Sequence, residues 1–168
     1  MTPTVHLLCG LNGAGKTTHA KRLAEELPGV RFTLDEWMLR LYGISFDHPE
    51  YAQLVEGCTQ LVWDTAQQVI AIGGDVILDW NCWSVERRRL WADRASAAGA
   101  DVLLHHLTTD LATVHQRVVE RNGMGSPHAH RLTPDDVDHL AALFEPPSAD
   151  EGIPTVTVAN RSPRTLVD

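Results

Sequence analysis

The sequence has few cysteines and no long apolar run, and each absence excludes a class of protein. Its 168 residues contain only three cysteines, Cys9, Cys58 and Cys82, which lie far apart along the chain. A scattered, odd-numbered set indicates neither a disulfide framework nor a zinc site, and it favours a reducing compartment. No apolar run reaches the roughly 18 residues that a membrane-spanning helix needs, so the sequence predicts no membrane span.

The sequence also lacks a basic excess and a secretory leader. Its net charge is −8, whereas proteins that hold long nucleic acids usually carry a basic face. The acidic balance argues against a long nucleic-acid partner but allows a local basic pocket for one nucleotide. The N-terminus enters a strand-like segment without the layout of a signal peptide, which indicates the cytoplasm. Nothing in the sequence indicates an oligomeric state.

Short apolar segments alternate with helical patterns, which is typical of an α/β protein with a mostly parallel sheet. The length fits one domain over residues 1–168. Strands are expected at Val5–Cys9, Val30–Leu34, Val76–Asp79, Val102–Leu107 and Thr155–Val158. The 3.6-residue period predicts helices through residues 20–27, 50–72, 84–99 and 111–118, and a last helix that begins at Thr133-Pro134.

Residues 10–17 match the pattern G-x-x-x-x-G-K-[ST], between an apolar strand and an amphipathic helix. Glycines let the backbone N–H groups curl around phosphate, and the following helix presents its positive end to the anion. Lys16 is expected to reach the β and γ phosphates, and the Thr17 hydroxyl to ligate Mg²⁺. The residues expected to bind ATP and Mg²⁺ here are Gly10, Asn12, Gly13, Ala14, Gly15, Lys16, Thr17 and Thr18.

Two acids lie at the ends of expected strands. Asp79 is expected to hold Mg²⁺ together with Thr17, and the alternative is an ordinary solvated acid. Asp35 follows the second strand, at the edge where ligands of open α/β sheets bind. Its carboxylate could accept the proton of a substrate hydroxyl while the γ-phosphoryl group is transferred. The alternative is a helix N-cap, and the residues leave both interpretations open.

Arg117 and Arg121 share one helix face just before a polar loop, Asn122–Arg131, that is rich in glycine and histidine. Guanidinium groups suit the charge that spreads over the γ oxygens during transfer, so Arg121 with Arg117 or Arg131 is expected at the phosphates. The loop is expected to close over the nucleotide as a lid. A solvated basic face is the alternative for the helical pair.

Aromatic and histidine side chains form two further groups. Three tryptophans lie near the expected strand ends, Trp37, Trp80 and Trp83. They either line an apolar substrate pocket or fill the edge of the core. Four histidines are candidate zinc ligands, His105 and His106 in a strand and His128 and His130 in the loop. A zinc site would need further ligands with convergent geometry, so it is the less favoured interpretation.

The segment Asp79-Trp-Asn81-Cys-Trp-Ser-Val-Glu86-Arg87-Arg88 resembles the D-x-N…E-R-R segment of phage-type polynucleotide 5′-hydroxyl kinases. Residues 117–122, Arg-Val-Val-Glu-Arg-Asn, are similar to their R-N lid segment. The resemblance covers roughly residues 4–145 and extends to zeta toxins, gluconate-type kinases and chloramphenicol phosphotransferases. It implies a P-loop NTPase fold of the kinase type. That fold has a five-stranded parallel sheet of order 2-3-1-4-5 with helices on both faces, and a lid at about residues 122–133.

The resemblance also implies roles for particular residues. Asp35 falls where these kinases keep their catalytic aspartate, and Asn81 with Arg87 or Arg88 would face the phosphate acceptor. One departure matters, because the polynucleotide kinases carry an arginine three residues after the aspartate and this chain has Met38. Arg40 is the candidate replacement. The change puts recognition of a nucleic-acid or nucleotide 3′-phosphate in doubt.

The sequence therefore predicts an ATP- and Mg²⁺-dependent kinase that phosphorylates a hydroxyl of a small molecule. One alternative acceptor is the 5′-hydroxyl of a nucleic acid or nucleotide. An alternative from another class is an ATP-binding regulatory module without an acceptor, although the N-K-x-D segment of common GTPase switches is absent. An open pocket of small-molecule size beside Asp35 would favour the kinase over the regulatory module.

Overall fold

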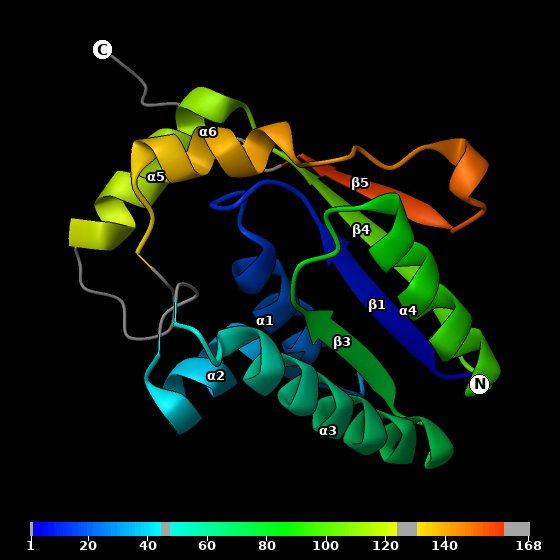
Figure 1. Ribbon diagram of the computed structural model, residues 1–168. Coiled ribbons are helices and arrows are strands. Elements are labelled where there is room, and N and C mark those ends of the chain that lie inside the picture. The colour runs from blue at the N-terminus through cyan, green and yellow to red at the C-terminus, as the bar shows by residue number, and fades with distance from the viewer. Residues whose placement is uncertain (1, 45–47, 124–130, 160–168) are drawn as a thin grey trace.

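The computed structural model describes residues 2–44, 48–123 and 131–159, and a five-stranded parallel sheet forms its centre (Figure 1). The strands are β1 (Thr4–Cys9), β2 (Gly29–Thr33), β3 (Asp75–Asp79), β4 (Asp101–Thr108) and β5 (Thr155–Ala159). Their order across the sheet is β2-β3-β1-β4-β5, and all neighbours are parallel. This arrangement confirms the fold class that the resemblance implied.

Helices lie on both faces of the sheet (Figure 1). They are α1 (Lys16–Glu26), α2 (Leu34–Tyr42), α3 (Tyr51–Ala71), α4 (Val85–Ala97), α5 (Leu111–Gly123) and α6 (Pro134–Ala142). Successive side chains of β1 point to opposite faces, so Leu7 joins the core under α3 and α4 whereas Leu8 joins the core under α1. Both leucines are fully buried. Burial on both faces explains why the central strands read as continuous apolar runs.

The start of α2 differs from the expectation. The sequence pattern placed Leu34 in a strand and offered Asp35 as a helix N-cap, but the N-cap is Thr33 and Leu34 is already helical. Asp35 therefore lies inside the first turn, and the N-cap interpretation is wrong by two positions. The first turn still favours acids, because the helix dipole is positive there. By contrast, α6 begins as expected, with Thr133 as its N-cap in a capping box with Asp136.

The strand register brings the strand ends together at one edge of the sheet. Thr33 of β2 pairs with Asp79 of β3, and Cys9 of β1 pairs with His106 of β4. The loops that follow these strands therefore leave from the same edge, which is where open α/β sheets bind their ligands.

Candidate active site

The phosphate loop connects β1 to α1 at this edge. Gly10, Gly13 and Gly15 have φ angles of 143°, 90° and 95°, a region that favours glycine. Gly15 is the N-cap of α1, and no side chain of the described residues caps it. The first N–H groups of the helix can therefore face an anion. Lys16 Nζ donates to the carbonyl oxygens of Gly10 at 2.8 Å and Leu11 at 3.0 Å, so the lysine lies over the loop.

A network of oxygens and one guanidinium links α1, β2, β3 and α2. The Thr17 hydroxyl donates to Asp79 Oδ1 at 3.2 Å. Arg31 Nη1 donates to Asp79 Oδ2 at 2.6 Å, and Arg31 Nη2 donates to both carboxylate oxygens of Glu36 at 3.1 Å. The sequence pattern did not indicate Arg31 or Glu36 as site residues. The available signal was an arginine inside a strand expected to be covered on both faces, because a charge there needs a partner.

Electrostatics bring the two candidate acids and the candidate cations into one region. Burial raises the pKa of Asp79, and the hydrogen bond and charge of Arg31 oppose this. Burial lowers the pKa of Lys16, and Asp35 and Asp79 oppose this shift. Burial also lowers the pKa of Arg121, and Asp35 again opposes it. Asp35 therefore lies within electrostatic reach of both Lys16 and Arg121.

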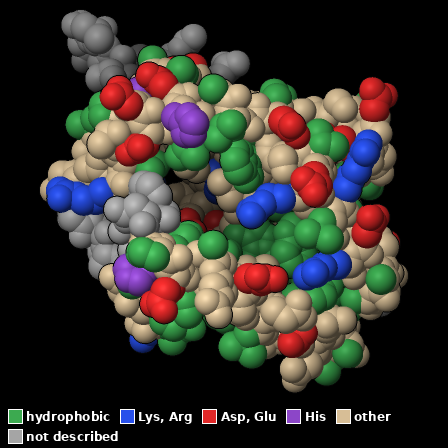
Figure 2. Space-filling view, in the orientation of Figure 1, with side chains coloured by type: hydrophobic (Ala, Val, Ile, Leu, Met, Phe, Trp, Pro, Cys, Tyr) green, Lys and Arg blue, Asp and Glu red, His purple; other side chains and the backbone are tan. Residues whose placement is uncertain are grey.

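Asp35 itself is exposed, on the first turn of α2. Burial raises the pKa of Tyr51, the first residue of α3, and the charge of Asp35 raises it further, so Tyr51 lies on the same side. In Figure 2 the surface is hollowed between α5 and α6 on one side and α2 on the other, and charged side chains are visible inside the hollow. The accessibility of Asp35 suits a group that must meet a substrate.

The other expected phosphate arginines lie near α5 and the lid. Arg117 is partly buried and contributes to lowering the pKa of the exposed Asp110 carboxyl, after the hydrogen bonds that Thr113 donates to it. Arg131 is exposed and donates to the Asn122 carbonyl at 3.3 Å. Residues 124–130, which include His128 and His130, lie outside the described residues. The lid and the loop part of the zinc interpretation therefore stay predictions.

Four of the residues expected to face the acceptor lie on α2, on the segment after β3 or on the first turn of α4. Trp37 is partly buried and Arg40 is exposed on the last turn of α2. The side-chain oxygen of Asn81 is buried and has no hydrogen-bond partner among the described residues. The exposed Arg87 donates to the Asn81 carbonyl at 3.4 Å. Met38 is fully buried, so the position where the resembling kinases carry an arginine points into the core.

Arg88 does not face the acceptor, and this part of the prediction is corrected. Its side chain is 0% exposed. Nε and Nη2 donate to the two carboxylate oxygens of Glu151 at 2.7 Å each, and Nη1 donates to the carbonyls of Cys82 and Glu145. The guanidinium is saturated by partners in the C-terminal part of the fold. Of the arginine pair, Arg87 is the one that can meet a substrate.

Members of the tryptophan and histidine groups are also buried in the core. Trp80 is 6% exposed, and its ring lies 4.7 Å from that of Trp91, so Trp80 fills the core. His105 lies between His6 and His19, with nitrogen–nitrogen distances of 2.9 and 3.0 Å. These distances fit direct hydrogen bonds and leave no room for an ion bound at about 2.0 Å from each nitrogen. Within residues 2–44, 48–123 and 131–159, no group of three or more His, Cys, Asp or Glu side chains is arranged to hold a metal ion.

Residues 5–147 match a family of AAA domains. The chain belongs to this AAA domain family. The matched residues run from β1 to the segment after α6 and include the whole phosphate loop, so nucleotide binding follows from the family and the fold together. No curated protein matches the sequence closely enough to suggest a more specific relative.

Solved structures with the fold of this AAA domain include several kinases. A candidate kinase from Chloroflexus aurantiacus J-10-fl superposes with a TM-score of 0.75 at 19% identity, over 99% of this chain and 92% of that chain. A chain of the Pnkp1/Rnl/Hen1 RNA repair complex gives 0.70 at 19% identity, over 84% of this chain and 44% of that chain. A gluconokinase from Sinorhizobium meliloti 1021 gives 0.58 at 15% identity, over 96% and 83%. These likenesses confirm the P-loop kinase fold.

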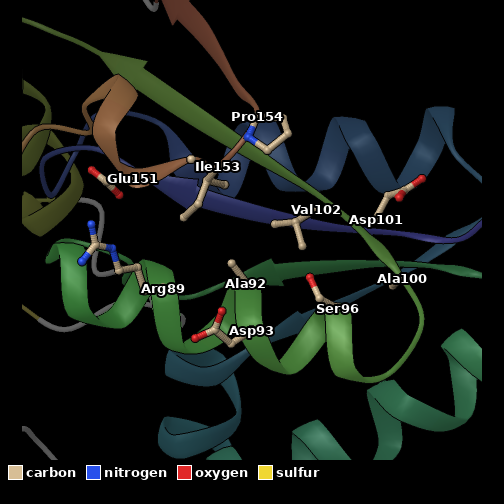
Figure 3. Close-up of a pocket in the computed structure, with 11 residues that line it drawn as sticks. Arg89, Ala92, Asp93, Ser96, Ala100, Asp101, Val102, Glu151, Ile153 and Pro154 are labelled. Carbon is tan, nitrogen blue, oxygen red and sulfur yellow. The ribbon is translucent and has the colours of Figure 1, made fainter.

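A cavity of about 360 Å³ in this AAA domain lies away from the phosphate loop (Figure 3). Its walls come from α4, the beginning of β4 and the segment before β5, including Asp93, Asp101 and Pro154. The phosphate loop follows the opposite end of the sheet, after β1. The cavity is therefore separate from the hollow beside α2. No helix of the described residues is both long and apolar enough to cross a membrane.

Proposed function

We propose that this AAA domain is an ATP- and Mg²⁺-dependent kinase that transfers the γ-phosphoryl group to a hydroxyl of a small molecule. One observation carries the proposal: the phosphate loop places Thr17 within 3.2 Å of Asp79, while the exposed Asp35 lies within electrostatic reach of Lys16. A phosphate cradle, a pair of oxygen ligands and a carboxylate base are the parts that phosphoryl transfer needs.

The loop and its flanks suit the nucleotide and its metal ion. Backbone N–H groups of residues 10–15, with Lys16 and Thr18 at the start of α1, would hold the phosphates. The Thr17 hydroxyl and Asp79 Oδ1 are hard oxygen donors on facing elements, which fits Mg²⁺. When bound, the ion neutralises charge on the phosphates.

The transfer step uses groups on both sides of the hollow. Asp35 would accept the proton of the acceptor hydroxyl as its oxygen bonds to the γ phosphorus and the bond to the β-phosphate oxygen breaks. Arg121, with Arg117 or Arg131, would stabilise the charge on the transferring group. The acceptor would lie against side chains of α2, of the segment after β3 and of the start of α4, namely Trp37, Arg40, Asn81 and Arg87. The gluconokinase among the similar structures supports a small acceptor.

A 5′-hydroxyl of a nucleic acid or nucleotide is the alternative acceptor, supported by the likeness to the RNA repair complex. Two observations stand against it. The net charge is −8, and the position where the resembling kinases carry an arginine holds Met38, which is buried. An ATP-binding regulatory module without an acceptor is less well supported, because Asp35 is exposed on the first turn of α2. The three cysteines are free thiols, which supports a cytoplasmic location.

Lys16→Ala tests the nucleotide site directly. We expect the variant to lose detectable MgATP turnover and to bind ATP more weakly, because the loop loses its only side-chain cation for the phosphates, while its melting temperature stays near that of the wild type. Calorimetric titration with ATP and an assay of ADP formation measure both. The matched control is Arg89→Ala, which removes an exposed cation of α4. Unchanged affinity and turnover in Lys16→Ala would refute the assignment. A separate screen of metabolites as acceptors identifies the product that the wild type forms.

A further inference from the structure

Arg31 bridges two elements of the proposed site. It lies on β2 with 15% of its side chain exposed, between Asp79 at the end of β3 and Glu36 on the first turn of α2. The bond to Asp79 is 2.6 Å and the two bonds to Glu36 are 3.1 Å. Asp79 is 4% exposed, so this carboxylate has little access to water and depends on its protein partners.

Each end of the bridge touches a different half of the proposed chemistry. The second oxygen of Asp79 accepts the hydroxyl of Thr17, the pair that suits the metal ion. Glu36 directly follows Asp35, the proposed base, in the same helical turn. A guanidinium is a planar fork whose donors point in fixed directions, so it sets the relative orientation of the carboxylates that it binds.

We propose that Arg31 is a positioning residue for phosphoryl transfer. It holds the Asp79 carboxylate in place for the metal ion, and it holds the first turn of α2, with Asp35, in place for the acceptor. This assignment rests on the proposed function, since it takes Asp79 and Asp35 as members of that site. A substitution at Arg31 should change two measurable quantities. It should reduce the gain in ATP affinity that Mg²⁺ gives, because Asp79 loses its partner, and it should reduce the rate of transfer, because α2 loses its partner.

Arg31→Gln tests the arm to Asp79 without any acceptor. Calorimetry measures the affinity for a non-hydrolysable ATP analogue in Mg²⁺ and in EDTA. The affinity in Mg²⁺ divided by the affinity in EDTA is the Mg²⁺ ratio. We expect the ratio to fall by about 10- to 100-fold, the usual cost of losing a group that orients a metal ligand, and the affinity in EDTA to stay within about threefold. Arg31→Lys keeps a charge but not the fork and should give an intermediate ratio. The matched control, Arg89→Gln, changes an exposed arginine of α4 and should leave the ratio unchanged.

Glu36→Gln tests the arm to α2, and it also weakens the 4.0 Å ion pair of Glu36 with Lys21. Arg31 keeps its bond to Asp79 in this variant, so the Mg²⁺ ratio should match the wild type, whereas slow ADP formation from MgATP with water as acceptor should fall about tenfold. A wild-type ratio in Arg31→Gln overturns the proposal. It is also overturned if both variants change the ratio equally and in proportion to their melting temperatures, because Arg31 then only stabilises the fold. A wild-type protein that fails to bind MgATP would instead refute the proposed function itself.

Discussion

Two arginines, Arg31 and Arg88, each hold carboxylates inside the protein, and their surroundings differ. Arg88 is 0% exposed and its main partner Glu151 is 2% exposed, whereas Arg31 is 15% and Glu36 is 20% exposed. Arg88 meets one carboxylate and completes its donors with backbone carbonyls. Arg31 meets two carboxylates, those of Asp79 and Glu36.

The partners of the two arginines distinguish a structural ion pair from a candidate binding site. Around Arg88 one positive and one negative charge balance, and water is excluded, so the pair ties the C-terminal segment to α4. Around Arg31 more groups share the charge, because the guanidinium binds Asp79 and Glu36 and Lys21 Nζ also lies 4.0 Å from Glu36 Oε1. Asp35 lies on the same turn of α2. Carboxylates next to a phosphate loop suit a bound cation. Substitutions near Arg31 should therefore change function, and substitutions at Arg88 should change stability.

The largest effect is expected for Asp35→Asn on the site side of this comparison. The amide keeps the shape of the side chain but cannot take up the acceptor proton, so transfer should fall by roughly 10²–10⁴-fold with nucleotide affinity unchanged. Because Asp35 is not the N-cap of α2, the melting temperature should fall only slightly, through the loss of a helix-dipole interaction of about 0.3–1 kcal/mol. Single-turnover transfer to the acceptor found by the metabolite screen measures the rate, with Asp93→Asn on α4 as control. Transfer within about threefold of wild type would mean that the transition state needs no base.

Arg88→Met should produce the largest loss of stability, with little effect on the site. The substitution leaves Glu151 buried without its partner, which typically costs about 3–5 kcal/mol in the free energy of unfolding. Adding Glu151→Leu to the same protein should restore most of this loss, because no unpaired charge remains. Urea unfolding measures both variants, and calorimetry should show unchanged MgATP affinity while the protein is folded. A greater loss of nucleotide affinity than of stability would place Arg88 in the site after all.

The sequence predicted the parts of the site that are local in the chain. The phosphate loop is contiguous, and Asp79 follows an apolar run, so spacing alone pointed to Lys16, Thr17 and Asp79. The strand order needed the family resemblance, because periodicity does not fix which strands are neighbours.

The partners of the two arginines could not be predicted in the same way. Arg31 and Asp79 are 48 positions apart, and Arg88 and Glu151 are 63 apart. Spacing rules for charged pairs apply within a helix, whereas these pairs depend on how separate elements pack. The resemblance carried by the E-R-R motif therefore offered Arg87 or Arg88 as a substrate residue, although tertiary packing buries Arg88. The start of α2 was missed for a related reason. In the sequence, Thr33 and Leu34 read as a continuation of the strand, whereas in the structure Thr33 is the N-cap and Leu34 is the first residue of the helix.

A third buried polar cluster is made of histidines, and no carboxylate of the described residues lies within hydrogen-bond distance of it. His6 Nδ1 lies 2.9 Å from His105 Nε2, His105 Nδ1 lies 3.0 Å from His19 Nε2, and Arg22 lies 3.1 Å from His19 Nδ1. Since Arg22 can only donate, a continuous chain requires each imidazole to be neutral and to donate to the next. Asp75, 4.0 Å from His6, is beyond hydrogen-bond distance.

The histidine cluster should make stability depend on pH between about pH 4 and pH 6.5, whereas the hydrogen bond from Arg88 lowers the pKa of Glu151 and moves the pH dependence of that pair to more acidic values. Burial lowers the pKa of His105 from 6.5 to about 4, so the unfolded chain binds more protons than the folded chain between these values. Stability is therefore complete above pH 6.5 and falls as the pH is lowered, by at most about 1.4 kcal/mol per pH unit for this residue. Urea unfolding at pH 7 and pH 5 measures the slope. The exposed His139, changed to Gln, should leave it unaltered, and a flat profile in the wild type would show that the imidazoles are charged or solvated.

The smallest effects are expected for a pair of glycine substitutions that separates the loop from the scaffold. Gly57 lies inside α3 with no atom near the position of an added Cβ, so Gly57→Ala should stabilise the protein by about 0.5–1 kcal/mol through helix propensity. Gly13 has a φ of 90°, and a Cβ there would lie 3.2 Å from Val118 Cγ2, so Gly13→Ala should cost about 1–2 kcal/mol and also weaken MgATP binding. Unfolding and nucleotide titrations of both variants give the comparison. A loss of MgATP affinity in Gly13→Ala but not in Gly57→Ala would show that the backbone of the loop serves the ligand. Unchanged MgATP affinity in Gly13→Ala would show that nucleotide binding tolerates a shift of that backbone.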